Sequence, residues 1–440
     1  MRTKDPKRAA VEIFLRTCAA IDVETLFNQK LSLQGEELIL GDSQRIALGA
    51  FDRIFAIGVG KASLKMGRAL ERLLGSRITK GILVTDRRHK LDVRSEVLVG
   101  SHPTPDETSL IAGRKVMDLV ASADEHTLVI FLISGGGSSL IEVPLVPEVT
   151  AEDIACLNRI LITSSATIHE INVVRKHLSL VKGGRLGALA AGAGCLAIYV
   201  SDVNSGDLQS VASNPVLSDA AELSEFFDVV ARYELVRKLP KKFARAIESG
   251  KIPELPRAGC DALTFLLSDN STAMSAAASA AADMGFRTEV FADLVEGDYK
   301  EIADKMLDRL IHLRGEDETR PLCVISGGEV ICPVHGGGRG GRNQEFVLYS
   351  AAQLRKHGGS TAVLSCGTDG IDGNSVAAGA VADSRTIEEA RSFGLDYLEF
   401  LENNDSFSFF RRAGGLVVTG PTGNNVRDVR LMLCNADGLA

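Results

Sequence analysis

Short apolar runs alternate along most of the chain with stretches in which apolar residues recur at helical spacing. Leu128–Ile133 is one such run, and residues 62–74 form one such stretch, with Met66, Leu70 and Leu74 on the same side. Strands that are apolar without interruption are typical of parallel sheets covered by helices on both faces. The pattern therefore predicts an α/β fold, in which ligands are expected at the polar tips that follow the strands.

A first helix is predicted near the N-terminus, where Asp5 and Pro6 provide capping residues. Because the spacing of its apolar residues is helical, we expect one side of this helix to face the core. The residues expected on that side are Val11, Phe14, Leu15, Cys18 and Ala19.

The segment 232–257 is charged and interrupted by prolines, and it has only weak periodicity. Such composition is typical of a connector between domains. We therefore expect two α/β domains, at residues 1–245 and 258–440. The extreme C-terminal strands are the part of the second domain that could pack on the first.

Composition excludes several classes of protein. A net charge of −8 without runs of Lys or Arg argues against nucleic-acid binding. None of the eight cysteines forms a C-x-x-C pair, so buried thiols are expected rather than a zinc site or disulfides. Leu186–Val200, the longest uncharged apolar stretch, is too short to cross a bilayer. These features favour a cytoplasmic protein, and we expect a monomer or a homodimer.

The run from Ser326 to Phe346 is the richest in candidate chemistry. An apolar strand, Leu322–Ile325, stops at the tip 326–329, and glycines then bracket Arg339 and Arg342 before Asn343 opens a predicted helix. Glycines let backbone amides approach an anion, and guanidinium groups bind phosphate or carboxylate with two hydrogen bonds. A flexible linker is the alternative, but linkers seldom carry two arginines and a helix-capping residue. We expect an anion site here.

Two further strand tips are rich in glycine. The tip at 134–139 could form a nest of amides and hydroxyls around an anion, or simply a tight turn; its candidate residues are Ser134, Gly135, Gly136, Gly137 and Ser138. The tip at 58–61 ends in Lys61 and matches neither a P-loop nor a complete G-x-G-x-x-G motif. A partial fit to the latter, with Asp86 at the end of the next strand, keeps a dinucleotide-binding enzyme as an alternative.

Cations and carboxylates cluster elsewhere in the chain. Arg175 and Lys182 belong to a basic stretch at 172–185, for which a solvated helix face is the alternative. Asp202 ends a strand, while Asp369 and Asp372 share one glycine-rich loop. Carboxylates in such positions could hold Mg²⁺ or accept a proton, although ordinary turns have the same composition. Arginines, glycine nests and strand-end aspartates together suit phosphoryl transfer, which depends on positioning and charge neutralisation.

Several motifs in this order resemble those of the glycerate 2-kinase family, whose C-terminal part is the MOFRL domain. They are I-S-G-G-G-S-S-L (133–140), R-K-H-L-S-L-V-K-G-G-R-L (175–186), S-D-V (201–203), S-G-G-E (326–329), G-R-G-G-R-N-Q-E (338–345), G-T-D-G-I-D-G (367–373) and V-V-T-G-P-T-G-N-N-V-R-D (417–428), together with H-P-T-P-D (102–106). The chain departs from the family at Ser213–Val216, where S-G-P-T is usual. It also departs in the glycine run before R-G-G-R, where a Lys is frequent and only His335 and glycines precede Arg339.

The resemblance implies ATP-dependent phosphorylation of D-glycerate to 2-phosphoglycerate. It implies a Rossmann-like N-terminal domain, a C-terminal MOFRL domain and an active site in the cleft between them. It also implies that Lys61 and Arg342 act in catalysis or binding, with Asp202 as a further participant.

Combined with the residue chemistry, the resemblance leads to a specific hypothesis. Lys61 and Arg342 neutralise the transferred phosphoryl group, and Asp202 receives the hydroxyl proton. The nest at 134–139 fixes the substrate carboxylate, together with either Arg175 or Lys182. Glu329, Arg339 and Asn343 are expected at the same phosphate site, and Asp369 or Asp372 is expected to hold Mg²⁺.

Two alternatives remain open on the residues. One is an NADP-linked hydroxypyruvate or 2-oxoacid reductase that uses the unit from Gly58 to Asp86, with Arg87 and Arg88 on a 2′-phosphate. The other is a sensor of sugar acids without enzymatic activity. The reductase would use a single loop and leave the other glycine-rich tips without a role.

Overall fold

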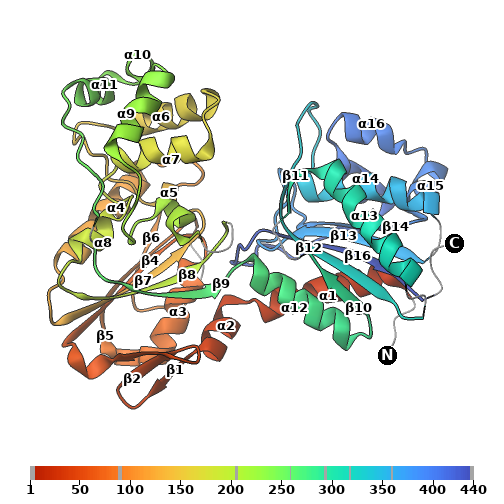
Figure 1. The fold of residues 1–440 in the computed structure, drawn as a ribbon, viewed down its shortest axis with the longest axis horizontal. Helices are drawn as coiled ribbons and strands as arrows, with labels where there is room; N and C mark the ends of the chain where they lie inside the picture. Colours follow the sequence, from red (N-terminus) through yellow and green to blue (C-terminus); the bar gives the residue numbers. More distant parts are fainter. Residues whose placement is uncertain are drawn as a thin grey trace. The chain divides into compact units, whose positions relative to one another are not determined.

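The computed structural model of the chain divides into two compact units (Figure 1). It describes residues 5–87, 92–203, 207–257, 259–291, 295–316, 319–357 and 360–436. We call residues 26–267 the central unit, and residues 1–25 together with 268–440 the terminal unit.

The central unit is built on a six-stranded sheet in the order β6-β5-β4-β7-β8-β9. Neighbouring strands from β6 to β8 pair in parallel. This is the expected parallel α/β architecture, and chain order reverses between the neighbours β4 and β7. The strands are β4 (Arg53–Val59), β5 (Ile78–Thr85), β6 (Glu96–Val99), β7 (Thr127–Ser134), β8 (Gly194–Val200) and β9 (Leu263–Ser268).

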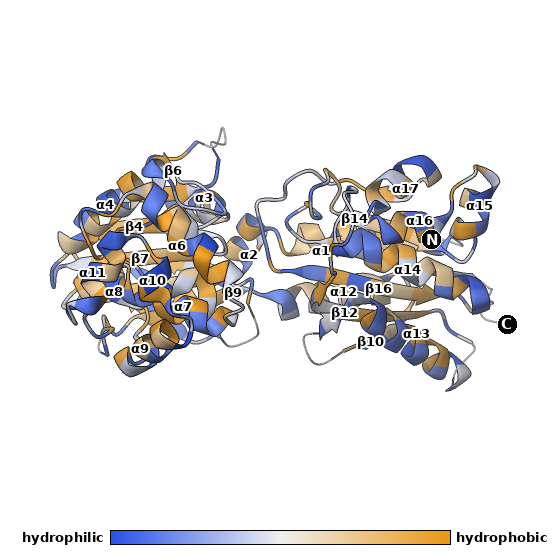
Figure 2. Cartoon of the chain, turned by 90° about the horizontal axis from the view of Figure 1, so that it is seen from above, coloured by the Kyte–Doolittle hydropathy of each residue, from blue (hydrophilic) through white to orange (hydrophobic). Residues whose placement is uncertain are grey.

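Burial explains why these runs form strands. All residues of β7 are buried, and hydropathy colouring shows apolar residues along the strands of the sheet (Figure 2). Helices cover the sheet, and some of them form a second apolar core of their own. The helices are α2 (Val23–Lys30, which begins in the terminal unit), α3 (Ser63–Leu74), α4 (Glu107–Ala121), α5 (Gly137–Leu140), α6 (Ala151–Thr163), α7 (Ile168–His177), α8 (Arg185–Leu189), α9 (Leu223–Arg232), α10 (Leu235–Lys238) and α11 (Lys241–Glu248); a small antiparallel sheet adds β1 (Leu31–Gln34), β2 (Glu37–Leu40) and β3 (Gln44–Ala47).

The terminal unit contains a mixed sheet in the order β10-β12-β16-β13-β14-β15, with β11 paired to β12. Here the expectation of a largely parallel sheet is wrong, because β16 lies between β12 and β13 and is antiparallel to both. The strands are β10 (Arg287–Val290), β11 (Val295–Asp298), β12 (Leu322–Ile331), β13 (Thr361–Gly367), β14 (Gly379–Asp383), β15 (Leu416–Val417) and β16 (Asp428–Cys434). The helices are α1 (Pro6–Ala20), α12 (Asn270–Asp283), α13 (Tyr299–Glu316), α14 (Arg342–His357), α15 (Thr386–Ser392), α16 (Tyr397–Glu402) and α17 (Ser406–Ala413).

The N-terminal helix α1 lies in the terminal unit. It packs on α12 and β13, which are far from it in the sequence. Its buried face holds Ala9, Ala10, Ile13 and Phe14, whereas Leu15 is 44% exposed. The expected face is therefore only partly correct. Ala9 and Ala10 are small and allow α1 to approach the alanine-rich α12 closely.

These units differ from the expected domains in two respects. The first 25 residues group with the C-terminal half, and the chain passes between the units near residue 267 rather than at 245–258. The last strands, β15 and β16, belong to the terminal sheet. Among the described residues, no helix is both long and apolar enough to cross a membrane.

Candidate active site

In the central unit, the turns that follow β4 and β7 are held together. The amide of Lys61 donates to the carbonyl of Gly135 at 3.0 Å, and the amide of Ala62 donates to the hydroxyl of Ser134 at 3.0 Å. Since these strands are the neighbours at which chain order reverses, their tips form the usual ligand position of an open α/β sheet. The structure thus brings Lys61 and the 134–139 tip together, as the hypothesis requires.

The 134–139 tip presents open backbone amides. Gly136 adopts a left-handed conformation, with φ 81°, and initiates the short helix α5. Within the described ranges, no hydrogen-bond acceptor is found for the amides of residues 135 to 138. Successive amides around a left-handed residue form a concave site for anions. This geometry favours the nest over the simple tight turn.

Three side chains surround this nest. A Cβ atom placed on Gly136 would lie 3.2 Å from both Lys61 Cγ and His102 Cδ2, and a Cβ atom on Gly135 would overlap Asp202 Oδ2. Burial lowers the pKa of His102, and the neighbouring Lys61 lowers it further. His102 was not among the predicted site residues, although it begins the H-P-T-P-D run. Glycine is needed in the turn because larger residues would displace these groups.

A cavity of about 40 Å³ opens beside the nest. Its wall includes Ser138, Arg175 and Lys182 together with Glu142, which the sequence did not single out. Lys182 is almost fully buried and forms an ion pair with Glu142, so its charge is already balanced. Burial lowers the pKa of Lys182, while Glu142 opposes this shift.

Arg175 has a different environment in the same cavity. Its Nε donates to Asn158 Oδ1 at 2.8 Å, and no ion pair is found for it among the described residues. Burial lowers the pKa of Arg175 below its usual range. A half-buried guanidinium whose charge no carboxylate balances directly is well placed to receive the carboxylate of a ligand. The basic stretch is therefore not simply a solvated helix face.

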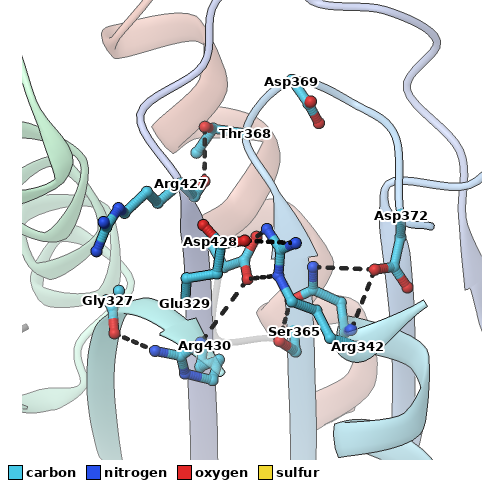
Figure 3. A network of polar contacts seen from close by, with 12 residues as sticks. Gly327, Glu329, Arg342, Ser365, Thr368, Asp369, Asp372, Arg427, Asp428 and Arg430 are labelled. Carbon is cyan, nitrogen blue, oxygen red and sulfur yellow. Dashed lines mark hydrogen bonds and ion pairs between the residues drawn. The ribbon is translucent and has the colours of Figure 1, made fainter. Parts of the chain in front are cut away.

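In the terminal unit, Arg342 is the centre of a network of ion pairs (Figure 3). Its Nε and Nη2 donate to the two oxygens of Asp428 at 2.6 and 3.0 Å, and its Nη1 lies 2.8 Å from Glu329 Oε1. Asp428 is fully buried, and Arg430 Nη1 lies 3.9 Å from it. Burial acts to lower the pKa of Arg342, but Asp428 and then Glu329 raise it above its ordinary value.

Asp428 and Arg430 were missed as functional residues. Asp428 ends the V-R-D run of the resembling motifs, which is the signal that could have identified it. Arg430 appears in sequence as one polar position in an apolar strand, yet it is fully buried with a pKa that burial lowers to about 10. Its guanidinium donates to the carbonyl of Gly327.

The glycine-rich loop at 336–341 does not form the open cradle expected from its sequence. Its amides, with that of His335, donate to groups of the same unit: His335 and Gly336 to Asn404, Gly337 and Gly338 to Asn403, Arg339 to Asp405, and Gly340 to Asn374. Sequence shows that glycine allows amides to converge but not which acceptors will reach them. The backbone of this loop therefore offers few free amides to an anion.

Arg339 and Asn343 are also engaged within the unit. The Arg339 guanidinium lies 4.7 Å from the centre of the Phe407 ring, a cation–π contact. Asn343 is buried, and its amide group donates to Asp372 at 3.2 Å. Neither arrangement places the side chain beside Arg342's ion pairs, so both residues remain only predicted members of the phosphate site.

Asp372 does not fit the predicted role of a magnesium ligand. Its carboxylate accepts hydrogen bonds from the backbone and side-chain amides of both Asn343 and Gln344, at 2.9 to 3.2 Å. These contacts use about all four lone-pair positions of a carboxylate. Burial raises the pKa of Asp372 to about 6, against the effect of these hydrogen bonds. The residue stabilises the start of α14.

Asp369 stays a predicted metal ligand. One of its oxygens accepts a hydrogen bond from the amide of Ile371 at 3.0 Å. Within the described part of the chain, no group of three or more His, Cys, Asp and Glu side chains could hold a metal ion.

The fold and these clusters define an α/β protein with basic side chains in two separate cavities. A family model described as a domain of unknown function, DUF4147, matches residues 9–248, and the MOFRL family model matches residues 322–428. A D-glycerate 2-kinase is 35% identical to this chain over 86% of its length, so the chain belongs to the glycerate 2-kinase family.

The alignments with similar proteins cover most of this chain and most of each relative. The D-glycerate 2-kinase of Thermotoga maritima is 35% identical over 384 residues, which cover 86% of this chain and 90% of that protein. A putative hydroxypyruvate reductase of Agrobacterium vitis is 38% identical over 387 residues, which cover 87% of each chain. The crystal structure of a glycerate kinase from Thermotoga maritima matches with a TM-score of 0.84 and 33% identity, covering 97% of this chain and 99% of that one.

Proposed function

We propose that this protein transfers the terminal phosphoryl group of ATP to the C2 hydroxyl of D-glycerate, which yields 2-phosphoglycerate. The observation that carries the proposal is the open nest at residues 135–138, with Lys61 and Asp202 beside its glycines. It combines amides that bind an anion, a cation for developing charge and a carboxylate for a proton. Because the central sheet has the strand order of a Rossmann fold, we also assign this unit as Rossmann-like.

The cavity beside the nest suits the carboxylate of D-glycerate. We assign this carboxylate to Arg175 and Ser138 rather than to Lys182, because Glu142 already balances the charge of Lys182. Clamping the carboxylate holds the adjacent C2 hydroxyl, whereas the C3 hydroxyl keeps one more rotatable bond. Rigid positioning lowers the barrier by several kcal/mol, on the order of the gains known for well-oriented reactants.

Lys61 and Arg342 are assigned to the charge that develops on the transferred phosphoryl group, and Asp202 to the hydroxyl proton. Phosphoryl transfer needs such fixed positive charge more than covalent help from the protein. Asp369 is the remaining protein ligand that we propose for Mg²⁺, whose chemistry would be to neutralise phosphate oxygens.

Reductase activity is the second candidate, since some relatives are named putative hydroxypyruvate reductases. It would need Asp86 for a ribose and Arg87 for a 2′-phosphate. Arg87 instead donates to Asp86 at 3.1 Å, so both groups are engaged with each other, and Arg88 lies outside the described residues. This contact favours the kinase.

A direct assay distinguishes the two activities. Purified protein is incubated with D-glycerate and Mg-ATP, and separately with hydroxypyruvate and NADPH, while ADP and NADPH are measured. Phosphorus NMR then separates the secondary 2-phosphate ester from the primary 3-phosphate ester. We expect ADP and 2-phosphoglycerate; 3-phosphoglycerate alone would contradict the carboxylate clamp, and NADPH oxidation without a phosphoester would support the reductase.

A further inference from the structure

The terminal unit contains a larger cavity, of about 390 Å³, beside Arg342. Its wall includes Arg342, Glu329 and Glu345, with Val330 and Val334 as apolar neighbours. Its volume lies within the usual range for small-molecule sites, roughly 300–1,000 Å³. Arg342 is the only Lys or Arg side chain on the described part of the wall.

The two carboxylates that pair with Arg342 are not equivalent. Asp428 contacts it through two short hydrogen bonds and is fully buried on β16. Its backbone carbonyl also accepts a hydrogen bond from Asn270 Nδ2 at 3.0 Å, which fixes this strand position. Glu329, near the C-terminal end of β12, forms one ion pair with Arg342, through Oε1, and its side chain is 45% exposed. Water can therefore solvate the Glu329 carboxylate when it leaves Arg342. The Asp428 carboxylate is fully buried, so it would lose its ion pair without gaining contact with water.

Charge balance gives the same result. Within this network of ion pairs, Arg342 and Arg430 are matched by Asp428 and Glu329, and no ion pair of Glu345, the other carboxyl on the wall, is found among the described residues. When Glu329 turns outward, one positive charge is left facing the cavity through Arg342 Nη1. An oxyanion that takes this place restores the balance and gains a charge-assisted hydrogen bond.

We propose that this cavity binds the phosphoryl donor through its phosphate oxygens, and that Glu329 is a counterion that these oxygens displace from Arg342. Glu329 thus competes with phosphate instead of binding it, which changes the role predicted for it from sequence. The proposal rests on the proposed function for the identity of the ligand, but the exchange of one oxyanion for another needs only Arg342 and Glu329.

The test measures binding of ATP and of inorganic phosphate to the full-length chain by titration calorimetry. Glu329→Gln should tighten both by ~2–5-fold, the factor expected from removing one exposed ion pair. The matched control is Glu296→Gln: Glu296 is similarly exposed and pairs with Arg427 at 2.8 Å, but it does not line the cavity. Binding by this control should equal that of the unaltered protein.

A second pair of variants separates this inference from the proposed function. Glu329→Gln should have no effect on phosphate binding in an Arg342→Gln background, because the competition is for that guanidinium. Unchanged or weaker binding by Glu329→Gln alone would overturn the displacement. If Arg342→Gln by itself leaves ATP binding and glycerate phosphorylation intact, the assignment of Arg342 under the proposed function fails, whatever Glu329→Gln does.

Discussion

At the scale of single residues, the position of Lys61 depends on its backbone as much as on its charge. Its amide is bonded to Gly135, and its side-chain carbons approach Gly136. The ammonium group is therefore carried by the same pair of turns that presents the open amides. A cation preorganised in this way stabilises developing charge without the cost of reorganising solvent.

Replacing Lys61 with alanine should lower kcat by ~100-fold or more, the scale seen when one preorganised charge-stabilising group is lost. Steady-state phosphorylation of D-glycerate measures the effect. Lys115→Ala, which removes an exposed lysine of the same unit, is the control and should be neutral. Near-normal turnover by a folded Lys61→Ala protein would remove Lys61 from the mechanism.

Arg342→Lys tests the shape of the guanidinium rather than its charge. Lysine has no planar fork and cannot keep both hydrogen bonds to Asp428, so the remaining charge would no longer be held in place. We expect kcat to fall by at least ~10-fold, from the loss of one charge-assisted hydrogen bond. Arg355→Lys, on the exposed side of the same helix, should leave kcat unchanged. Retained activity in Arg342→Lys would show that a point charge is enough.

Arg175→Ala tests the carboxylate clamp. Loss of a charge-assisted hydrogen bond should raise KM for D-glycerate by ~10-fold or more and leave KM for ATP nearly unchanged. The control is Arg159→Ala, an exposed arginine on the neighbouring helix α6. Equal increases in both KM values would indicate a general structural effect instead of a contact with glycerate.

At the scale of elements, α14 is held at its start by contacts of its first turn and of the loop before it. Asp372 accepts from its first free amides, and the loop before it is bonded to the turn between α16 and α17. Further along, the Glu345 carboxyl is buried near Ser406, the first residue of α17. Burial raises the pKa of Glu345 to about 7, although the nearby Ser406 acts against this shift.

Glu345 should make stability depend on pH. Below about pH 4.5 the carboxyl is protonated in both the folded and the unfolded chain. Between that pH and about 7 only the unfolded chain loses the proton. The free energy of unfolding therefore falls as pH rises through this range. Glu345→Gln should therefore be more stable than the unaltered protein above pH 7, by at most about 3 kcal/mol, and similar to it near pH 4. Urea unfolding across this range measures the difference. The exposed Glu402→Gln should leave the dependence of stability on pH unchanged. If the stability of Glu345→Gln varied with pH in the same way as that of the unaltered protein, the raised pKa of Glu345 would be refuted.

At the scale of the whole molecule, the terminal unit joins the two ends of the chain. Helix α1 packs on β13 and α12, although more than half of the sequence separates them. The unit can therefore complete its core only after the N-terminal helix has returned to it. Contacts between such distant segments carry a loop-closure entropy that the packing of α1 must offset.

Phe14→Ala should destabilise the terminal unit by about 3–5 kcal/mol, the usual cost of removing a buried phenylalanine. Its neighbour Leu15 is 44% exposed, so Leu15→Ala is a matched control with little expected effect. Hydrogen exchange measured by mass spectrometry should show lost protection in β13 and β16 but not in β4 and β7. Loss of protection in both units would contradict the division of the chain.

How much could be predicted differs between the two sites. The strand tips with Lys61, the 134–139 nest and Asp202 follow from sequence, because parallel strands place their carboxyl ends on one edge. His102 lies beside the same nest, whereas Arg175, on helix α7, lines the cavity next to Ser138. The pairing of Lys182 with Glu142 and of Arg342 with Asp428 could not be predicted, since hydrophobic periodicity carries no information on which charged side chains meet.

Alternation of apolar runs with helical spacing was enough to determine an α/β fold, because burying those residues leaves few other arrangements. It also placed the glycine-rich tips at the carboxyl ends of the strands, where ligands are expected. Only the tertiary structure decided that β16 is inserted antiparallel in the terminal sheet, that α1 joins that unit, and that one glycine loop has open amides while the other is closed by Asn403, Asn404 and Asn374. These outcomes depend on contacts between residues far apart in the chain, whose free energies no local pattern contains.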